Sequence, residues 1–356
     1  MRITAVEITP LDLQLQTALT VAYGSYPVLN YALIRVITDE GLVGLGEASP
    51  DPVVTGETQE SVLAALRGAA PRWVGRDAME LEALLREAEE SMPHTPAALA
   101  ALDMALYDLM GQKLGVPVYQ LLGGRSRPGM ALYPVIPLDE ARVMAEMSAR
   151  FAGMGATVLK VKLGGDAALD LQRVQAICAA VGGGVRLRLD VNQGWQNAET
   201  AIGVIRALQA YPIEWVEQPL AAGDITGMAA VTAAVDVPVM ADESCHSAAD
   251  VIQIARLRAA RMINIKLMKC GGMLRAAKML AAAEAAGLTC ILGSMGESTI
   301  GSAAGLHFVT ANPTIAACEA IGPLFITNDP ASGFGVDPAT LWASPSDQPG
   351  LGVKLR

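Results

Sequence analysis

The sequence predicts an α/β protein with an eight-stranded barrel that follows a smaller α+β region. From about residue 126, short apolar strands alternate with Ala-rich helical stretches, which is typical of βαβ units on a parallel sheet. The predicted strands end at Pro134, Lys162, Asp190, Glu217, Asp242, Lys266, Gly293 and Glu319. Successive ends lie 24 to 28 residues apart, and such even spacing indicates a closed barrel rather than an open sheet.

Length and composition agree with a large folded core. The chain has 356 residues, enough for roughly two domains, and 52% of them are apolar. Its formal charge of −10 disfavours a nucleic-acid partner, because no basic stripe would attract phosphates. No apolar run is long enough for a membrane span, and the N-terminus lacks a signal-peptide core, so we expect a cytoplasmic protein. The five cysteines form no CxxC pair and are expected to be reduced and mostly buried.

The first 125 residues are predicted to form the α+β region. Strands over 32–37 and 42–47 flank a polar turn at 39–41 and predict a hairpin. Helices are predicted over 57–68, 78–91 and 95–113, the last of them starting at Thr95-Pro96 and ending near Gly115. The last residues are rich in Pro, Gly, Asp and Ser and are expected to return onto this region. We therefore divide the chain into 1–125 with the tail 325–356, and a barrel domain over 126–324.

Charged side chains gather at the predicted strand ends, which form the catalytic face of such a barrel. They are Lys160 and Lys162 on the second strand, Asp190, Glu217 and Asp242 on the third to fifth, and Lys266 on the sixth. Three carboxylates at one rim are costly unless a cation compensates their charge. Oxygen-only ligands suit a hard ion, so we predict Mg²⁺, with Mn²⁺ as an alternative.

This arrangement predicts removal of an α-proton from a carboxylate substrate. Bound Mg²⁺ would acidify that proton, because it stabilises the ene-diolate formed on deprotonation. Lys160 and Lys162 point to the same side of their strand, so their repulsion and the metal charge are expected to lower an ammonium pKa toward neutrality. Lys266 lies on the opposite side of the carboxylates, which permits proton removal from one face and return on the other. A single charged strand end is more often a solvated rim residue, but that explanation does not account for six in this order.

The same residues resemble a known family. Lys160-x-Lys162, the three carboxylates and the stretch 266–272 are similar to the enolase superfamily, in its muconate-lactonizing-enzyme subgroup. The stretches 46–50, 54–58 and 293–298 resemble the dipeptide epimerase branch. The resemblance implies a modified (β/α)7β TIM barrel under an α+β capping domain.

The resemblance also implies residue roles. Asp190, Glu217 and Asp242 would bind Mg²⁺, and Lys162 and Lys266 would be the acid/base pair. Lys160 would hold the substrate carboxylate and tune Lys162. Further substrate contacts are expected at Asn192, Ser294, Glu319 and Tyr26. A lysine on the sixth strand argues against the mandelate racemase subgroup, which uses a His-Asp dyad there.

Two departures from the dipeptide epimerase pattern bear on the substrate. That branch carries Asp-x-Asp after the eighth strand to grip an ammonium group, whereas this chain has Glu319 and Ile321. The expected mobile loop at 20–29 has no Arg or Lys, unlike that of members acting on Ala-Glu. We therefore expect a smaller or less charged substrate, such as an α-amino or imino acid or its N-modified form. The alternative is that Glu319 only packs against the barrel rim.

The leading hypothesis is racemisation or epimerisation of an amino-acid derivative or dipeptide through an enolate. Elimination of water from a β-hydroxy amino or imino acid, such as 3-hydroxyproline, is an alternative. Muconate-type cycloisomerisation is another, since Glu319 and the stretch 322–324 also resemble those enzymes. A non-catalytic binding barrel is the alternative from a different class. The expected partner is a small-molecule carboxylate, the chain is expected to form a homo-oligomer by analogy, and specificity is expected in the segments 20–29 and 50–57.

Overall fold

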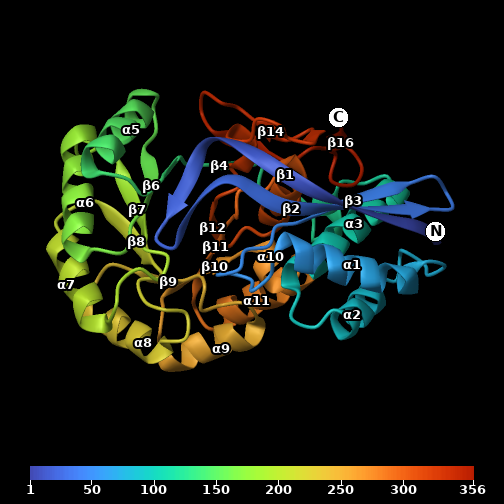
Figure 1. The fold of residues 1–356 in the computed structure, drawn as a ribbon, viewed down its shortest axis with the longest axis horizontal. Coiled ribbons are helices and arrows are strands. Elements are labelled where there is room, and N and C mark those ends of the chain that lie inside the picture. The colour runs from blue at the N-terminus through green and yellow to red at the C-terminus, as the bar shows by residue number, and fades with distance from the viewer.

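The computed structural model describes residues 1–356 and contains a curled parallel sheet surrounded by helices, with an antiparallel sheet beside it (Figure 1). The parallel sheet has eight strands in the order β12-β11-β10-β9-β8-β7-β6-β5, so each strand lies beside its neighbours in the sequence. The strands are β5 (Val135–Ile136), β6 (Val158–Lys162), β7 (Arg186–Asp190), β8 (Ile213–Glu217), β9 (Val239–Ala241), β10 (Met262–Ile265), β11 (Thr289–Leu292) and β12 (Ile315–Cys318). The connecting helices are α5 (Ala141–Gly153), α6 (Ala167–Val181), α7 (Ala198–Leu208), α8 (Ile225–Ala234), α9 (Ala248–Leu257), α11 (Met273–Ala285) and α12 (Thr299–Ala311), with the short α10 (Leu267–Cys270) before α11. No α-helix follows β12, which confirms the (β/α)7β pattern.

Side chains join the two ends of the parallel sheet. No backbone ladder links β5 to β12. Instead, the Tyr133 hydroxyl, just before β5, donates to Glu319 Oε1, just after β12, at 2.9 Å. Lys160 Nζ on β6 reaches the same carboxylate oxygen at 2.8 Å. The predicted strand ends lie within two residues of the observed ones, and the largest difference is at β5, which ends at Ile136.

The N-terminal region is a three-stranded antiparallel sheet with helices. Its strands are β1 (Ile3–Val21), β2 (Gly24–Thr38) and β3 (Val43–Ala48), and its helices are α1 (Gln59–Trp73), α2 (Leu81–Ser91), α3 (Pro96–Leu114) and α4 (Val118–Leu121). The predicted hairpin is confirmed, because β2 pairs with β3 across the turn at 39–42. Helix α3 begins at Pro96 and ends at Leu114, and the next residue, Gly115, has a φ of +69° in the left-handed region, so the helix ends near Gly115 as the sequence predicts.

The prediction of a loop over 20–29 is wrong. β1 and β2 continue through this segment, with Thr20 opposite Ser25 and Val21 opposite Gly24. Only Ala22 and Tyr23 form the turn, and the β-branched and aromatic residues beside them favour extended backbone. The Leu138 amide, after β5, donates to Thr20 O at 2.9 Å. The hairpin tip is therefore joined to the barrel, and Figure 1 shows it reaching toward β6 and α5.

Close backbone approach joins β3 to α3. A Cβ on Gly46 would lie 1.9 Å from Ala101 O, and one on Gly44 would lie 2.1 Å from Ala105 O. Both glycines are therefore needed for the sheet to lie directly on the helix. An apolar core of 83 buried residues continues from this layer into the barrel, so the N-terminal region and the barrel pack together.

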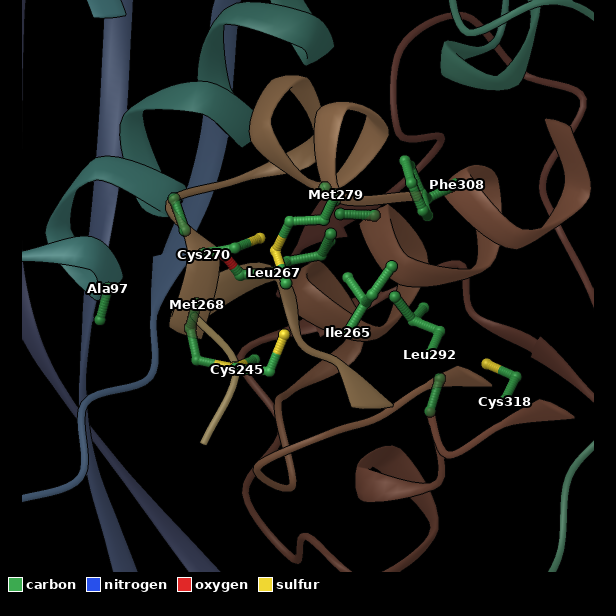
Figure 2. Packing of buried hydrophobic residues seen from close by; sticks show 14 of the residues in the cluster. Ala97, Cys245, Ile265, Leu267, Met268, Cys270, Met279, Leu292, Phe308 and Cys318 are labelled. Carbon is green, nitrogen blue, oxygen red and sulfur yellow. The ribbon is translucent and has the colours of Figure 1, made fainter. Parts of the chain in front are cut away.

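The cysteines are part of this packing. All five are free, four are buried and Cys178 is half-buried, as expected from the sequence. Figure 2 shows Cys245 and Cys270 among Leu267, Met268 and other apolar side chains of the core. No helix combines the length and apolarity that a membrane crossing requires.

The C-terminal tail returns to the N-terminal region. It contains a 3-10 helix (Gly322–Leu324) and the short strands β13 (Ala331–Ser332), β14 (Gly335–Val336), β15 (Trp342–Ser344) and β16 (Lys354–Leu355), and β15 pairs with β4 (Met130–Ala131). The Thr327 amide donates to Gln14 O at 2.9 Å, and the Gln14 amide donates to Asn328 Oδ1 at 2.7 Å. The Leu351 amide donates to Asp108 on α3 at 2.8 Å. These contacts agree with the expected return of the tail, while the domain boundary at 125 stays a prediction.

Candidate active site

Barrel register brings the predicted charged residues to one end of the sheet. Lys162, Asp190 and Glu217 are directly opposite one another on β6, β7 and β8. Lys160 is two residues earlier on β6 and shares the face of Lys162, because side chains alternate along a strand. Asp242 follows β9, and its side chain is fully buried, as are those of Asp190 and Glu217.

Four lysines pair with the carboxylates. Lys160 Nζ lies 2.9 Å from Asp190 Oδ2, 2.9 Å from Glu217 Oε2 and 2.8 Å from Glu319 Oε1. Lys162 Nζ donates to Asp190 Oδ2 at 2.7 Å and to Asn192 Oδ1 at 3.0 Å. On the other side, Lys266 Nζ and Lys269 Nζ lie 2.7 and 2.6 Å from the two oxygens of Asp242. Lys162 and Lys266 therefore approach the carboxylate cluster from β6 and from the end of β10, as predicted.

These pairs determine the direction of several pKa shifts. Burial lowers the pKa of Lys160, but the charges of Asp190, Glu217 and Glu319 outweigh it and raise this pKa well above its ordinary value. Burial lowers the pKa of Lys266, but the charges of Asp242, Glu217 and Glu243 together outweigh burial and raise this pKa. The carboxylates thus outweigh the positive charges around Lys160 in this arrangement, and the lowering of a lysine pKa by the metal and the neighbouring lysine stays a prediction.

The carboxylates respond differently to the same surroundings. Burial raises the pKa of Asp190, but Lys160 and Lys162 outweigh it and lower the pKa to about 2. Burial and the charge of Asp190 raise the pKa of Glu217 well above its ordinary value. Lysine charges hold the pKa of Asp242 well below its ordinary value despite burial. Asp190 and Asp242 are thus ionised ligand candidates, with Glu217 between them.

The loops that follow β7 and β8 hold strained backbone. Asn192, Gln193 and Gln218 have φ values of +44°, +69° and +38°, which non-glycine residues seldom adopt. The Gln218 side chain accepts from the Asp242 amide at 2.9 Å and donates to Leu220 O at 2.8 Å. Strained backbone of this kind persists where many surrounding contacts hold it in place, which is often the case at functional sites. Here it directs amide side chains at the residues around the carboxylates.

A cavity of about 450 Å³ opens above this cluster. Both lysines of the predicted acid/base pair line it, and so do the five predicted substrate contacts, Lys160, Asn192, Ser294, Glu319 and Tyr26. Asp190, Glu217 and Asp242 do not line it, because they are buried behind the lysines that pair with them. The structure therefore brings all ten predicted residues to one place, in two layers.

The carboxylate oxygens of Asp190, Glu217 and Asp242 are the kind of ligand that a hard divalent cation prefers. Glu217 Oε2 and Asp242 Oδ2 are buried oxygens that accept no hydrogen bond, and each faces a lysine ammonium group. Asn264 Nδ2 fixes the other oxygen of Glu217 at 2.7 Å. As the side chains stand, no three acidic groups converge to enclose an ion, and Lys160 Nζ fills the space between Asp190 and Glu217. Cation binding there requires this ammonium group to move away from the carboxylates.

Two predicted substrate contacts already have partners in the chain. Both oxygens of Glu319 accept from Lys160, at 2.8 and 3.0 Å, and one also accepts from the Tyr133 hydroxyl. Glu319 is therefore more than a rim residue that packs against the barrel. The Ser294 hydroxyl donates to the Glu297 carboxylate and accepts from the Gly296 amide at 2.9 Å.

Several residues of the site are not predicted from the sequence. Lys269 lies three residues after Lys266, and this spacing could have drawn attention to it. Asp51 lines the cavity from the segment 50–57, where specificity was expected. Arg150 lines the cavity from α5, is exposed and forms no ion pair. The cavity therefore has a positively charged side chain, although the segment 20–29 contains no Arg or Lys. Nothing in the local sequence around Tyr133 indicated its contact with Glu319.

Comparison with protein families agrees with this geometry. Residues 3–123 match the mandelate racemase/muconate lactonizing enzyme N-terminal domain, and residues 142–356 match the enolase C-terminal domain-like family. The chain belongs to the mandelate racemase/muconate lactonizing enzyme family. Its predicted membership of the enolase superfamily, as an enzyme, is therefore confirmed.

Several members of the family resemble the chain over its whole length. An N-succinyl-L-Arg/Lys racemase of Bacillus cereus is 37% identical, covering 100% of this chain and 96% of the relative, and its crystal structure superposes with a TM-score of 0.97. A hydrophobic dipeptide epimerase of Enterococcus faecalis is 36% identical over 94% of each chain. Its structure with Mg and the dipeptide L-Leu-L-Tyr covers 99% of this chain and 100% of its own, with a TM-score of 0.95. A chloromuconate cycloisomerase of Pseudomonas putida is 30% identical over 100% of this chain and 97% of its own length.

Proposed function

We propose that this enzyme racemises or epimerises an α-amino-acid derivative by removing and returning the proton α to its carboxylate. The observation that carries the proposal is the placement of Lys162 and Lys266 on opposite sides of three buried carboxylates, at the floor of one cavity. Two bases on opposite faces of one carbon are what inversion requires. The racemases and epimerases among the relatives support it.

In this proposal Asp190, Glu217 and Asp242 hold Mg²⁺, which the relative from Enterococcus faecalis also carries. The ion, when bound, would lower the pKa of the substrate α-proton and stabilise the negative charge left by its removal. Lys160 moves off Asp190 and Glu217, stays paired with Glu319 and binds the substrate carboxylate. Lys162 and Lys266 then take and return the proton, each on its own face.

We further propose that the substrate nitrogen is acylated rather than a free ammonium group. Glu319 is the only acid at the end of β12, and Lys160 and Tyr133 already occupy its oxygens. No unpaired carboxylate after β12 can therefore bind a substrate ammonium group, since Ile321 stands where dipeptide epimerases have a second Asp. The relative that acts on N-succinyl amino acids agrees with this choice.

Proton NMR in D₂O with Mg²⁺ tests the proposal on N-succinyl amino acids and on dipeptides. We expect the α-proton signal of N-succinyl substrates to wash out. We expect Lys162→Ala and Lys266→Ala to slow racemisation strongly, while each variant still exchanges the α-proton of one enantiomer. Loss of either base should slow turnover by about 10²- to 10⁴-fold. Lys278→Ala, an exposed lysine on α11, is the control that should change nothing. Racemisation at the normal rate in either active-site variant would contradict the assignment.

Cycloisomerisation is the second candidate, because a chloromuconate cycloisomerase resembles the whole chain. Formation of a lactone from muconate, without exchange of any amino-acid α-proton, would favour it. A cytoplasmic location and a homo-oligomeric state stay predictions. Size-exclusion chromatography with light scattering measures the second of these.

A further inference from the structure

We propose that Asp170, a buried carboxylate on α6, positions Lys162 for proton transfer by joining the two segments on which Lys162 depends. One is the segment after β6, which continues from Lys162, and the other is the segment after β7, which contains Asn192. Asp170 does not line the cavity and forms no hydrogen bond with Lys162, so it is a positioning residue. This inference rests on the proposed function, in which Lys162 serves one face of the substrate.

Three donors share the Asp170 carboxylate, which is fully buried. Its Oδ2 accepts from the Gly164 amide and from the Trp195 indole N–H, both at 2.9 Å. Its Oδ1 accepts from Arg173 on the same helix at 2.8 Å, and this ion pair balances the buried charge. One oxygen therefore connects the segment after β6 to the segment after β7.

The two segments also touch through their backbones. The Leu163 amide donates to Asp190 O at 2.8 Å, and the Gly165 amide donates to Gly194 O at 3.2 Å. A Cβ on Gly194 would lie 2.4 Å from Gly164 Cα, so only glycine fits at this contact. The contact therefore depends on the spacing of the segments, which the shared carboxylate oxygen bridges.

Lys162 takes its position from both segments. Its Nζ donates to Asp190 Oδ2 at 2.7 Å and to Asn192 Oδ1 at 3.0 Å, and both acceptors belong to the end of β7 and the turn after it. Lys162 stands two residues before Gly164, and Asn192 stands three residues before Trp195. Asn192 also has a φ of +44°, which surrounding contacts must hold in place. Misplacing a reacting group by about 1 Å can slow a reaction by about a hundredfold.

The opposite base does not depend on this bridge. Lys266 follows β10 and pairs with Asp242 at 2.7 Å, and neither residue forms a hydrogen bond with the segments that Asp170 joins. Loss of the bridge should therefore slow proton transfer on the Lys162 face more than on the Lys266 face. General loss of stability would instead affect both faces alike.

Exchange of the α-proton in D₂O with Mg²⁺, measured separately on N-succinyl-L-lysine and N-succinyl-D-lysine, tests this asymmetry. Lys162→Ala identifies the enantiomer that Lys162 deprotonates. We expect Asp170→Ala to slow exchange of that enantiomer by about ten- to a hundredfold, while the other keeps close to its wild-type rate. Asp170→Asn should recover most of the loss, because its amide oxygen can still accept from Gly164 and Trp195.

Two further variants separate positioning from folding. Trp195→Phe keeps a buried ring but removes one donor to Asp170, so it should give the same asymmetry with a smaller loss. Asp166→Ala removes the exposed cap of α6, which accepts from the Ala168 and Leu169 amides, and should change neither enantiomer. Equal slowing of both enantiomers in Asp170→Ala and Trp195→Phe would overturn the inference.

Amide hydrogen exchange followed by mass spectrometry separates this inference from the proposed function. Asp170→Ala and Trp195→Phe should raise amide exchange in peptides covering 160–166 and 190–196, and leave 262–272 unchanged. Such a local increase would support the bridge even if wild-type enzyme exchanged the α-proton of neither enantiomer, a result that would contradict only the proposed function. Unchanged amide exchange, or an increase throughout the chain, would overturn the role of Asp170.

Discussion

Replacing Lys269 by Met tests how much stability one buried ammonium group contributes to the site. Its side chain is fully buried, and its Nζ lies 2.6 Å from Asp242 Oδ1 and 2.9 Å from Asn264 O, with a further contact to Asp242 O. Met has a similar length but no charge and no donor, so these oxygens lose a partner. Removing one member of a buried ion pair costs about 3–5 kcal/mol. Because Asp242 retains Lys266 at 2.7 Å, we expect a loss nearer the lower value, about 3 kcal/mol.

Urea denaturation followed by circular dichroism measures this loss as a lower unfolding midpoint without metal. Lys278→Met is the matched control, because the Lys278 side chain is 59% exposed and its Nζ lies 3.5 Å from Glu82 Oε1. A surface pair of this kind contributes less than about 1 kcal/mol. If Lys269→Met and Lys278→Met lower the unfolding free energy equally, the reasoning is refuted. Lys266 alone would then satisfy Asp242.

Three further predictions use different parts of the molecule. Gly46→Ala should lower the melting temperature by several degrees, because the new Cβ would lie 1.9 Å from Ala101 O. Gly68→Ala, on the exposed face of α1, should instead raise the free energy of unfolding by about 0.5–1 kcal/mol. Similar effects of the two substitutions would contradict the close packing of β3 on α3. Burial raises the pKa of Glu57 to about 7, so the stability associated with its protonated form is present below about pH 4.5 and is lost as the pH rises through 7. Glu57→Gln should therefore gain stability relative to wild type between pH 5 and pH 8, by up to about 3 kcal/mol in urea melts, and a difference independent of pH would argue against this burial effect. Mg²⁺ at a hundred times its Kd should stabilise the enzyme by about 2.7 kcal/mol, and Asp242→Asn should lose most of this gain; stabilisation that survives in the variant would place the ion elsewhere.

Much of the fold and the site follows from local patterns. The barrel strands can be predicted because short apolar segments alternate with Ala-rich helical segments at an even spacing. The carboxylates of Asp190, Glu217 and Asp242 were found because strand ends of a parallel sheet must meet at one edge. These inferences need only short segments and one rule of topology.

Other features depend on contacts between distant segments, which local patterns do not contain. Lys160 and Glu319 are 159 residues apart in the sequence, so neither the bidentate pair nor the raised pKa of Lys160 could be predicted. The hairpin tip was mistaken for a loop because its pairing partner is needed to recognise the strand. Asp51 stands in a turn whose burial becomes evident only when the hairpin lies over it.

The tail contacts have a consequence for synthesis of the protein. Thr327 and Asn328 hold Gln14 on β1, so residues about 314 positions later in the chain fasten this strand. A nascent chain can form barrel units as they emerge, but β1 lacks these hydrogen bonds until residues 327 and 328 have also been made. Chains that stop early would therefore contain most catalytic groups without the secured hairpin that encloses them. The wall of the cavity that β1 and β2 form is therefore secured only in chains that extend past residue 328.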